Sequence, residues 1–180
     1  MLLRDDSARD MKTFIAILTC SLFVTPFAHA AFAPSVGDKV SYQLTHVQNG
    51  AVNGNYVMTN EITAIDQTTK TISVLQTVTL PNGQVMSSGT IPTPASNVAY
   101  PDEATIATCG IVSYPGQTGT PETIMVPAGT YKTCHIVLDP SAAGDKGEYY
   151  AASVPFGFVK SISTTSTGTM TSELTTFLKK

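Results

Sequence analysis

The first feature of the chain is a two-residue alternation of apolar and polar side chains that recurs between residues 39 and 178. In KVSYQLTHV, residues 39–47, Val40, Tyr42 and Leu44 share one parity and polar residues take the other. Because successive side chains of a strand point to opposite faces, this pattern predicts strands with one apolar face. The predicted strands cover residues 39–47, 56–65, 71–80, a stretch after the turn at 80–85, 108–114, 122–129, 130–138, 148–154, 158–164 and 169–178.

Turn residues separate these strands. Asn49-Gly50, Asn53-Gly54 and Asn82-Gly83 favour tight type I′ hairpins, because both residues readily take positive φ. Val-Pro-x-Gly occurs at 126–129 and again at 154–157, where proline and glycine favour a turn between two strands. The sequence therefore predicts an all-β protein, an antiparallel meander of about nine to ten strands that forms a strongly curved sheet or an open barrel.

One segment interrupts the strand pattern. Residues 91–105 contain Pro92, Pro94 and Pro101, and proline is excluded from central strands. We expect a crossover between N-terminal strands (31–90) and C-terminal strands (106–180), with a short helical turn after Pro101. A lid over a pocket is the alternative.

The N-terminal residues 11–30 have the organisation of a signal peptide. Lys12 begins the segment, Phe14–Val24 is apolar, and Pro26 precedes the small-residue cleavage site Ala28-His29-Ala30. The apolar run is shorter than the roughly 20 residues that span a bilayer. We therefore expect an exported protein, periplasmic or secreted, whose mature form, a single β domain of residues 31–180, does not span a membrane.

Two features of the N-terminal residues, the acidic residues 1–10 and Cys20, each have two explanations. Residues 1–10 carry acidic side chains where a signal peptide is basic, which indicates an over-long gene start or an extended n-region. Cys20 follows a short apolar run as in a lipoprotein, but the apolar residues continue beyond it. We expect Cys20 to be removed with the signal.

The composition argues against a nucleic-acid partner. The net charge is −3, there is no tryptophan, and both arginines lie within residues 1–10. The rest of the chain has neither a basic field nor a guanidinium for bidentate binding of phosphate.

Cys109 and Cys134 are the cysteines left after residue 30. An even pair in an exported chain is typically a disulfide, so we predict one bond between these two residues.

Candidate chemistry is sparse. Adjacent Cys134 and His135 would point to opposite faces of a strand, so they cannot act together as nucleophile and base. No spaced set of metal ligands is present, and the acidic loop Asp139–Glu148 is better explained as a solvated turn than as a calcium site. We predict no catalytic residue, no metal and no cofactor. A hydrolase that uses scattered carboxylates is a third hypothesis. Of the acids weighed for this role, those in predicted turns are Asp38, Asp66, Asp102, Glu103 and Asp145, and those within predicted strands include Glu61 and Glu173.

The C-terminal half resembles a class of uncharacterised bacterial exported proteins and lipoproteins. The motifs that carry the resemblance are Cys109, VPAGTYKTC at 126–134, YYAASVPFGFVK at 149–160 and ELTTF at 173–177. Members of this class share a VPAGTF–C strand, an aromatic-rich strand, a VPxGxVK turn and a closing EL strand, and no catalytic residues are attached to them. They are distantly similar to the half-open β-barrels of LolA/LolB-type lipoprotein carriers, although this chain has no long helix to plug a barrel. That likeness implies a concave sheet that holds an acyl chain.

These observations favour a non-enzymatic cell-envelope protein that binds an apolar ligand, a lipid or lipoprotein, or a partner protein on one sheet face. The alternative is a structural or surface-interaction protein with a filled core and no ligand. Candidate residues of the ligand face, which could equally form a plain core, are Tyr42, Leu44, Ile72, Val74, Tyr149 and Tyr150.

Overall fold

A computed structural model describes residues 33–98, 101–109, 119–138 and 145–180. The predicted signal segment 11–30 with Cys20, residues 1–10 and most of the loop 139–148 lie outside the described residues. The described chain contains nine strands: β1 (Lys39–Gln48), β2 (Ala51–Asp66), β3 (Thr71–Thr79), β4 (Val85–Pro94), β5 (Thr120–Val126), β6 (Gly129–Leu138), β7 (Lys146–Ala151), β8 (Phe158–Thr165) and β9 (Gly168–Leu178). It also contains two short helices, η1 (Ala95–Asn97) and α2 (Glu103–Thr108).

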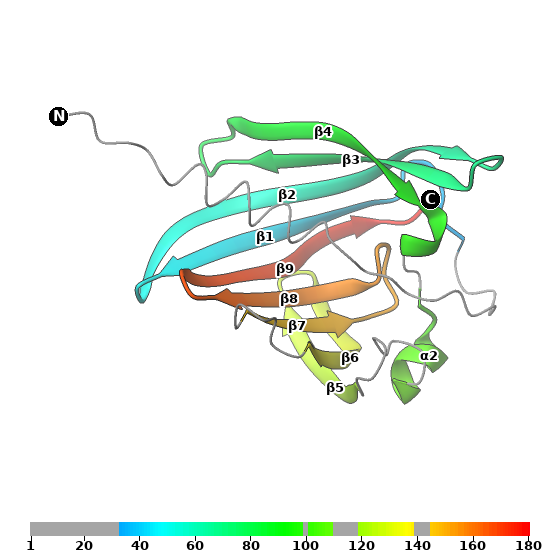
Figure 1. The fold of residues 1–180 in the computed structure, drawn as a ribbon. Coiled ribbons are helices and arrows are strands. Elements are labelled where there is room, and N and C mark those ends of the chain that lie inside the picture. Colours follow the sequence, from blue (N-terminus) through cyan, green and yellow to red (C-terminus); the bar gives the residue numbers. More distant parts are fainter. Residues whose placement is uncertain (1–32, 99–100, 110–118, 139–144) are drawn as a thin grey trace.

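All nine strands form one antiparallel sheet, in the order β4-β3-β2-β1-β9-β8-β7-β6-β5. The first and last strands of the chain therefore pair at the centre of the sheet, and each half of the chain extends outward as a meander (Figure 1). The sheet is open, with β4 at one edge and β5 at the other. The predicted all-β meander is confirmed.

Asn49-Gly50 forms the predicted tight turn, whereas the other two Asn-Gly pairs differ from the prediction. Asn49 and Gly50 have φ of 51° and 78°, as a two-residue turn between β1 and β2 requires. At Asn82-Gly83 only the glycine has positive φ, 83°, and its N–H donates to the Leu80 carbonyl at 2.9 Å, so this turn is centred on Pro81 and Asn82 and is not type I′. The turn predicted at Asn53-Gly54 is wrong, since both residues lie within the 16-residue strand β2. The chain has already reversed at Asn49-Gly50, and a register shift beside His46 lets β2 continue its pairing.

The sheet curls so that its C-terminal half returns to the centre. The backbone N–H of Ala128, in the β5–β6 turn, donates to the carbonyl of Leu174 in β9 at 3.0 Å. The main apolar cluster accordingly joins β1, β2, β3, β8 and β9 to the end of β5 and the β7–β8 connection. Its buried residues are Val40, Tyr42, Leu44, Met58, Val78, Val126, Ala152, Val154, Phe158, Val159, Met170 and Leu174.

Helix α2 follows Pro101, as the sequence predicts. The Asp102 side chain caps it by accepting a hydrogen bond from the Thr105 N–H at 2.6 Å. Cys109 ends the helix with a left-handed φ of 51°. The strand predicted at residues 108–114 therefore begins as a helix end, and residues 110–118 lie outside the described residues.

Candidate functional site

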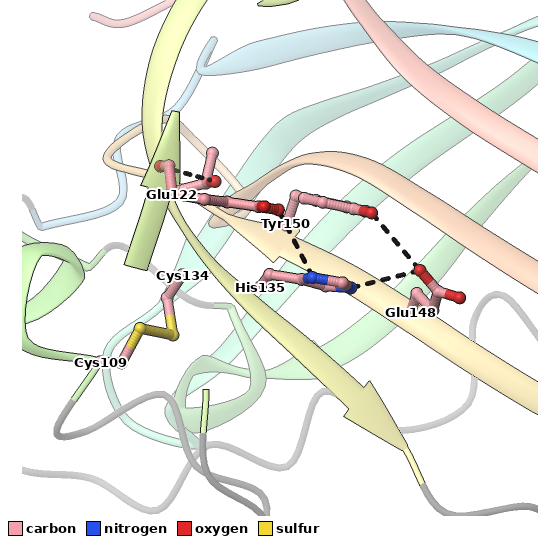
Figure 2. A network of polar contacts seen from close by, with 7 residues as sticks. Cys109, Glu122, Cys134, His135, Glu148 and Tyr150 are labelled. Carbon is pink, nitrogen blue, oxygen red and sulfur yellow. Dashed lines mark hydrogen bonds and ion pairs between the residues drawn. A yellow bond between two sulfur atoms is a disulfide. The ribbon is translucent and has the colours of Figure 1, made fainter. Parts of the chain in front are cut away.

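The first candidate site is the Cys134-His135 pair on β6. Cys134 is bonded to Cys109, which confirms the predicted disulfide. This bond attaches α2 to the sheet, where Ile106 and Cys109 pack on Cys134, Ile136 and Ala151. His135 points to the other side of the strand, away from the disulfide (Figure 2). Nucleophilic chemistry between the two residues is therefore excluded by their placement.

His135 lies between two carboxylates. Its Nδ1 is 3.4 Å from Glu122 Oε1 on β5, and its Nε2 is 3.2 Å from Glu148 Oε2 on β7. The ring stacks on Tyr150 with centroids 4.3 Å apart and planes 8° apart. The Tyr150 hydroxyl donates to the same Glu148 carboxylate at 3.4 Å (Figure 2).

This cluster continues along one transverse row of the sheet. The strand register places His135 opposite Tyr150, Tyr150 opposite Lys160 and Lys160 opposite Glu173. Lys160 Nζ is 6.0 Å from the Tyr150 ring centroid and 2.8 Å from Glu173 Oε1. Desolvation by burial, and secondarily the charge of Glu148, raises the pKa of Tyr150 above its usual range.

The arrangement suits cross-strand stabilisation better than catalysis. A histidine with a carboxylate at each ring nitrogen has neither nitrogen open to a substrate. Glu173 and Lys160 are likewise paired with each other. Opposite charges and stacked rings at directly paired positions each contribute roughly 0.2–1 kcal/mol to a sheet.

The sequence pattern did not connect His135 with Glu122 or Glu148. The missing information was the strand register, because the three residues come from three different strands. Within the described residues, no group of three or more His, Cys, Asp or Glu side chains could hold a metal ion.

The predicted ligand-face residues lie in different surroundings. Tyr42 and Leu44 are buried in the main apolar cluster. Ile72 and Val74 are buried in a second cluster with Ile62 and Val98. Tyr150 belongs to the polar row and also packs against the main apolar cluster, and Tyr149 is half-buried on the opposite side of β7. The structure thus places three of the six residues, Tyr42, Leu44 and Tyr150, at the main apolar cluster and Ile72 and Val74 in another.

A buried serine pair lies in the row next to the polar one. Ser161 on β8 and Ser172 on β9 are directly opposite each other and are 3% and 0% exposed. Ser172 also faces Leu44, and Ser161 faces Tyr149, so the hydroxyls interrupt an otherwise apolar row. Neither hydroxyl oxygen has a hydrogen-bond partner among the described residues. Buried hydroxyls without a partner are costly and call for an explanation.

Neither a protein-family model nor a curated protein matches this sequence. Solved structures with the same fold include a protein from Bacteroides fragilis NCTC 9343, described as exported and having a YmcC-like fold. It is 14% identical, with a TM-score of 0.52, and the match covers 83% of this chain and 99% of that one. A protein from Parabacteroides distasonis ATCC 8503, described as a lipoprotein, is 13% identical, with a TM-score of 0.52 and coverage of 84% and 100%.

These matches show the fold. Separately, no helix among the described residues is long and apolar enough to cross a membrane.

Proposed function

We propose that the protein is exported to the bacterial cell envelope and is a non-enzymatic binding protein for an amphiphilic acyl ligand, such as a lipid or the acylated end of a lipoprotein. The signal-peptide pattern at residues 11–30 supports export, and proteins of the same fold are described as exported or as a lipoprotein. The placement of Cys134 in a disulfide and the pairing of His135 with two carboxylates support a non-enzymatic role.

The observation that carries the ligand proposal is the buried pair Ser161 and Ser172. A pair of hydroxyls inside an apolar row offers hydrogen bonds to the polar head or ester of a ligand whose chain lies on the neighbouring apolar residues. Val126 at the end of β5 and Val154 in the β7–β8 connection pack into the main apolar cluster. Loops open locally at a lower free energy than a paired sheet, so a ligand would enter by movement of the β7–β8 connection.

Native mass spectrometry of protein purified from its own envelope tests the proposal. We expect an adduct of lipid mass that is lost when the protein is extracted with organic solvent. If no such adduct is detected under gentle conditions, and a fluorescent fatty acid such as cis-parinaric acid also fails to bind, the proposed binding of an acyl ligand is wrong.

A double substitution tests the role of the serine pair. Ser161→Ala with Ser172→Ala should weaken binding of cis-parinaric acid about 10-fold or more, since two hydrogen bonds of about 1 kcal/mol each are lost. The matched control is Ser87→Ala with Ser88→Ala, which removes two hydroxyls from exposed positions of β4 and should leave binding unchanged. Equal binding by both variants would contradict the assignment of the pair.

A second candidate function is a surface-interaction protein with a filled core. It is favoured by the burial of Tyr42, Leu44, Ile72 and Val74, all at most 7% exposed. A complete absence of bound lipid in the experiment above would favour it.

A further inference from the structure

The two edges of the open sheet differ in their protection against pairing with another strand. Edge strands present unpaired N–H and C=O groups, and proteins usually block them with charges, prolines or short length. Edge strand β5 is blocked in this way, since it has seven residues and contains Pro121 and Glu122. Its turn is also held to β9 by the Ala128 hydrogen bond.

Edge strand β4 lacks this protection over most of its length. It has ten residues, and neither it nor its neighbour β3 contains a charged side chain. Pro92 and Pro94 limit only its C-terminal end, so residues 85–91 form a continuous proline-free edge. Ser87, Ser88, Gly89 and Thr90 are all exposed, and a side chain added at Gly89 would meet no atom within 4 Å.

We propose that β4 pairs with β4 of a second copy of this chain, antiparallel about a two-fold axis near Ser88 and Gly89. The central residues of β4 would then face one another, and they are small and uncharged, so the pairing brings no like charges together. Hydroxyl pairs of this kind already link strands of this sheet: Thr77 and Ser88 are 3.4 Å apart between their oxygens, and Ser41 and Thr59 are 3.1 Å apart.

The blocked edge argues for a second copy in a closed dimer. Head-to-tail pairing of β4 with β5 would generate an open filament, whereas two-fold pairing of β4 with itself leaves only blocked edges exposed. The assembly is a continuous sheet through both copies. The paired edge has about seven residues and is roughly 23 Å long at 3.3 Å per residue. Pairing along one edge of this length buries less surface than a standard protein–protein interface, so the dimer is weak and its population depends on protein concentration.

Sedimentation velocity over about 1 µM to 1 mM of the protein expressed from its full sequence tests the proposal, since weak complexes are populated in that range. We expect a reversible shift from monomer to dimer. The variant Ser88→Lys with Thr90→Lys places two positive charges per copy at the pairing edge and should remain monomeric throughout. The matched control, Thr120→Lys with Met125→Lys, adds the same charges to exposed positions of β5 and should dimerise like the unsubstituted protein.

Hydrogen exchange keeps the test independent of any folding defect in the variants. In the unsubstituted protein, amides of residues 85–91 should exchange more slowly at the high concentration, while those of β5 should be unaffected. A monomer at every concentration, or a dimer that protects β5 and leaves β4 unchanged, would overturn the proposal.

Discussion

Tyr42 shows how one side chain holds the two halves of the sheet together. Its ring, from the first strand, stacks on Phe158 with centroids 4.7 Å apart, and its hydroxyl donates to the Phe158 carbonyl at 3.1 Å. Both residues belong to the main apolar cluster. The contact therefore joins β1 to the start of β8, which is not its neighbour in the sheet.

Replacing Tyr42 with phenylalanine should destabilise the fold by about 1–2 kcal/mol, because the ring contact is kept while a buried carbonyl loses its donor. Urea unfolding followed by circular dichroism measures the change. The control is Tyr131→Phe, since the Tyr131 hydroxyl makes a longer bond of 3.4 Å and is only half-buried. A loss at Tyr131 as large as at Tyr42 would contradict this account.

The same substitution should alter the response to alkaline pH. Burial raises the pKa of Tyr42, so the folded protein keeps the phenol proton at a pH where the unfolded chain has lost it. The stabilisation is complete below the ordinary tyrosine pKa of about 10 and declines as the pH rises above it. The difference in stability between the original protein and the Tyr42→Phe variant should therefore begin to shrink as the pH rises above about 10, as urea unfolding at a series of pH values would show.

Asp38 is a second residue whose contribution to stability depends on partners that its position in the sequence does not reveal. Its carboxylate is fully buried, accepts from the backbone N–H groups of Ser35 at 2.9 Å and Lys180 at 2.8 Å, and lies 3.1 Å from Lys179 Nζ. The sequence indicated only an acid in a turn. Its partners at the opposite end of the chain could not be foreseen, because they are brought near by the pairing of the first and last strands.

The substitution Asp38→Asn should reduce stability by about 2–4 kcal/mol, somewhat less than for a fully buried ion pair because Lys179 is partly exposed. Chemical unfolding is again the measurement. Glu61→Gln is the control: it breaks the exposed pair of Lys39 and Glu61, 3.2 Å apart, and should cost less than about 1 kcal/mol. Equal effects of the two substitutions would show that the buried Asp38 ion pair contributes no more to stability than the pair of Lys39 and Glu61.

At the scale of elements, α2 depends on the disulfide. The helix has six residues, too few to be stable alone, and it is held by its Asp102 cap, Ile106 and the Cys109–Cys134 bond.

The double substitution Cys109→Ser with Cys134→Ser should lower stability by about 2–4 kcal/mol, with the largest rise in hydrogen exchange at α2. Thiol titration of the original protein under denaturing, non-reducing conditions is the control and should find neither cysteine of this pair reactive. Unchanged exchange at α2 in the variant would show that the helix is held by packing alone.

The elements themselves were largely predictable from the sequence, because alternation and turn chemistry are local signals. Asn49-Gly50 and the segment 154–157 lie between strands, and the segment 126–129 forms the β5–β6 turn at Pro127-Ala128, as predicted. Asn53-Gly54 misled because the same dipeptide fits a turn or an irregular strand, and only the register with β1 decides between them. The polar row of His135, Tyr150 and Lys160 also required the register.

At the scale of the whole molecule, the order of the strands in the sheet could not be predicted from local sequence patterns. The pairing of Lys39 with Leu178 joins residues from opposite ends of the described chain. Long-range pairing of this kind is set by the total packing of apolar residues, which no short segment reveals. The sequence therefore predicted the sheet but not which strands would form its centre and its edges.

The central pairing of β1 with β9 also determines when the fold can be completed. A ribosome makes β1 early and β9 last, so β1 keeps one unpaired edge until almost the whole chain has been synthesised. Each meander can form its own hairpins before that moment, but the seam between them closes only at the end. Until that seam closes, the two meanders can form only separately, so the complete sheet forms late, which would suit the export proposed above.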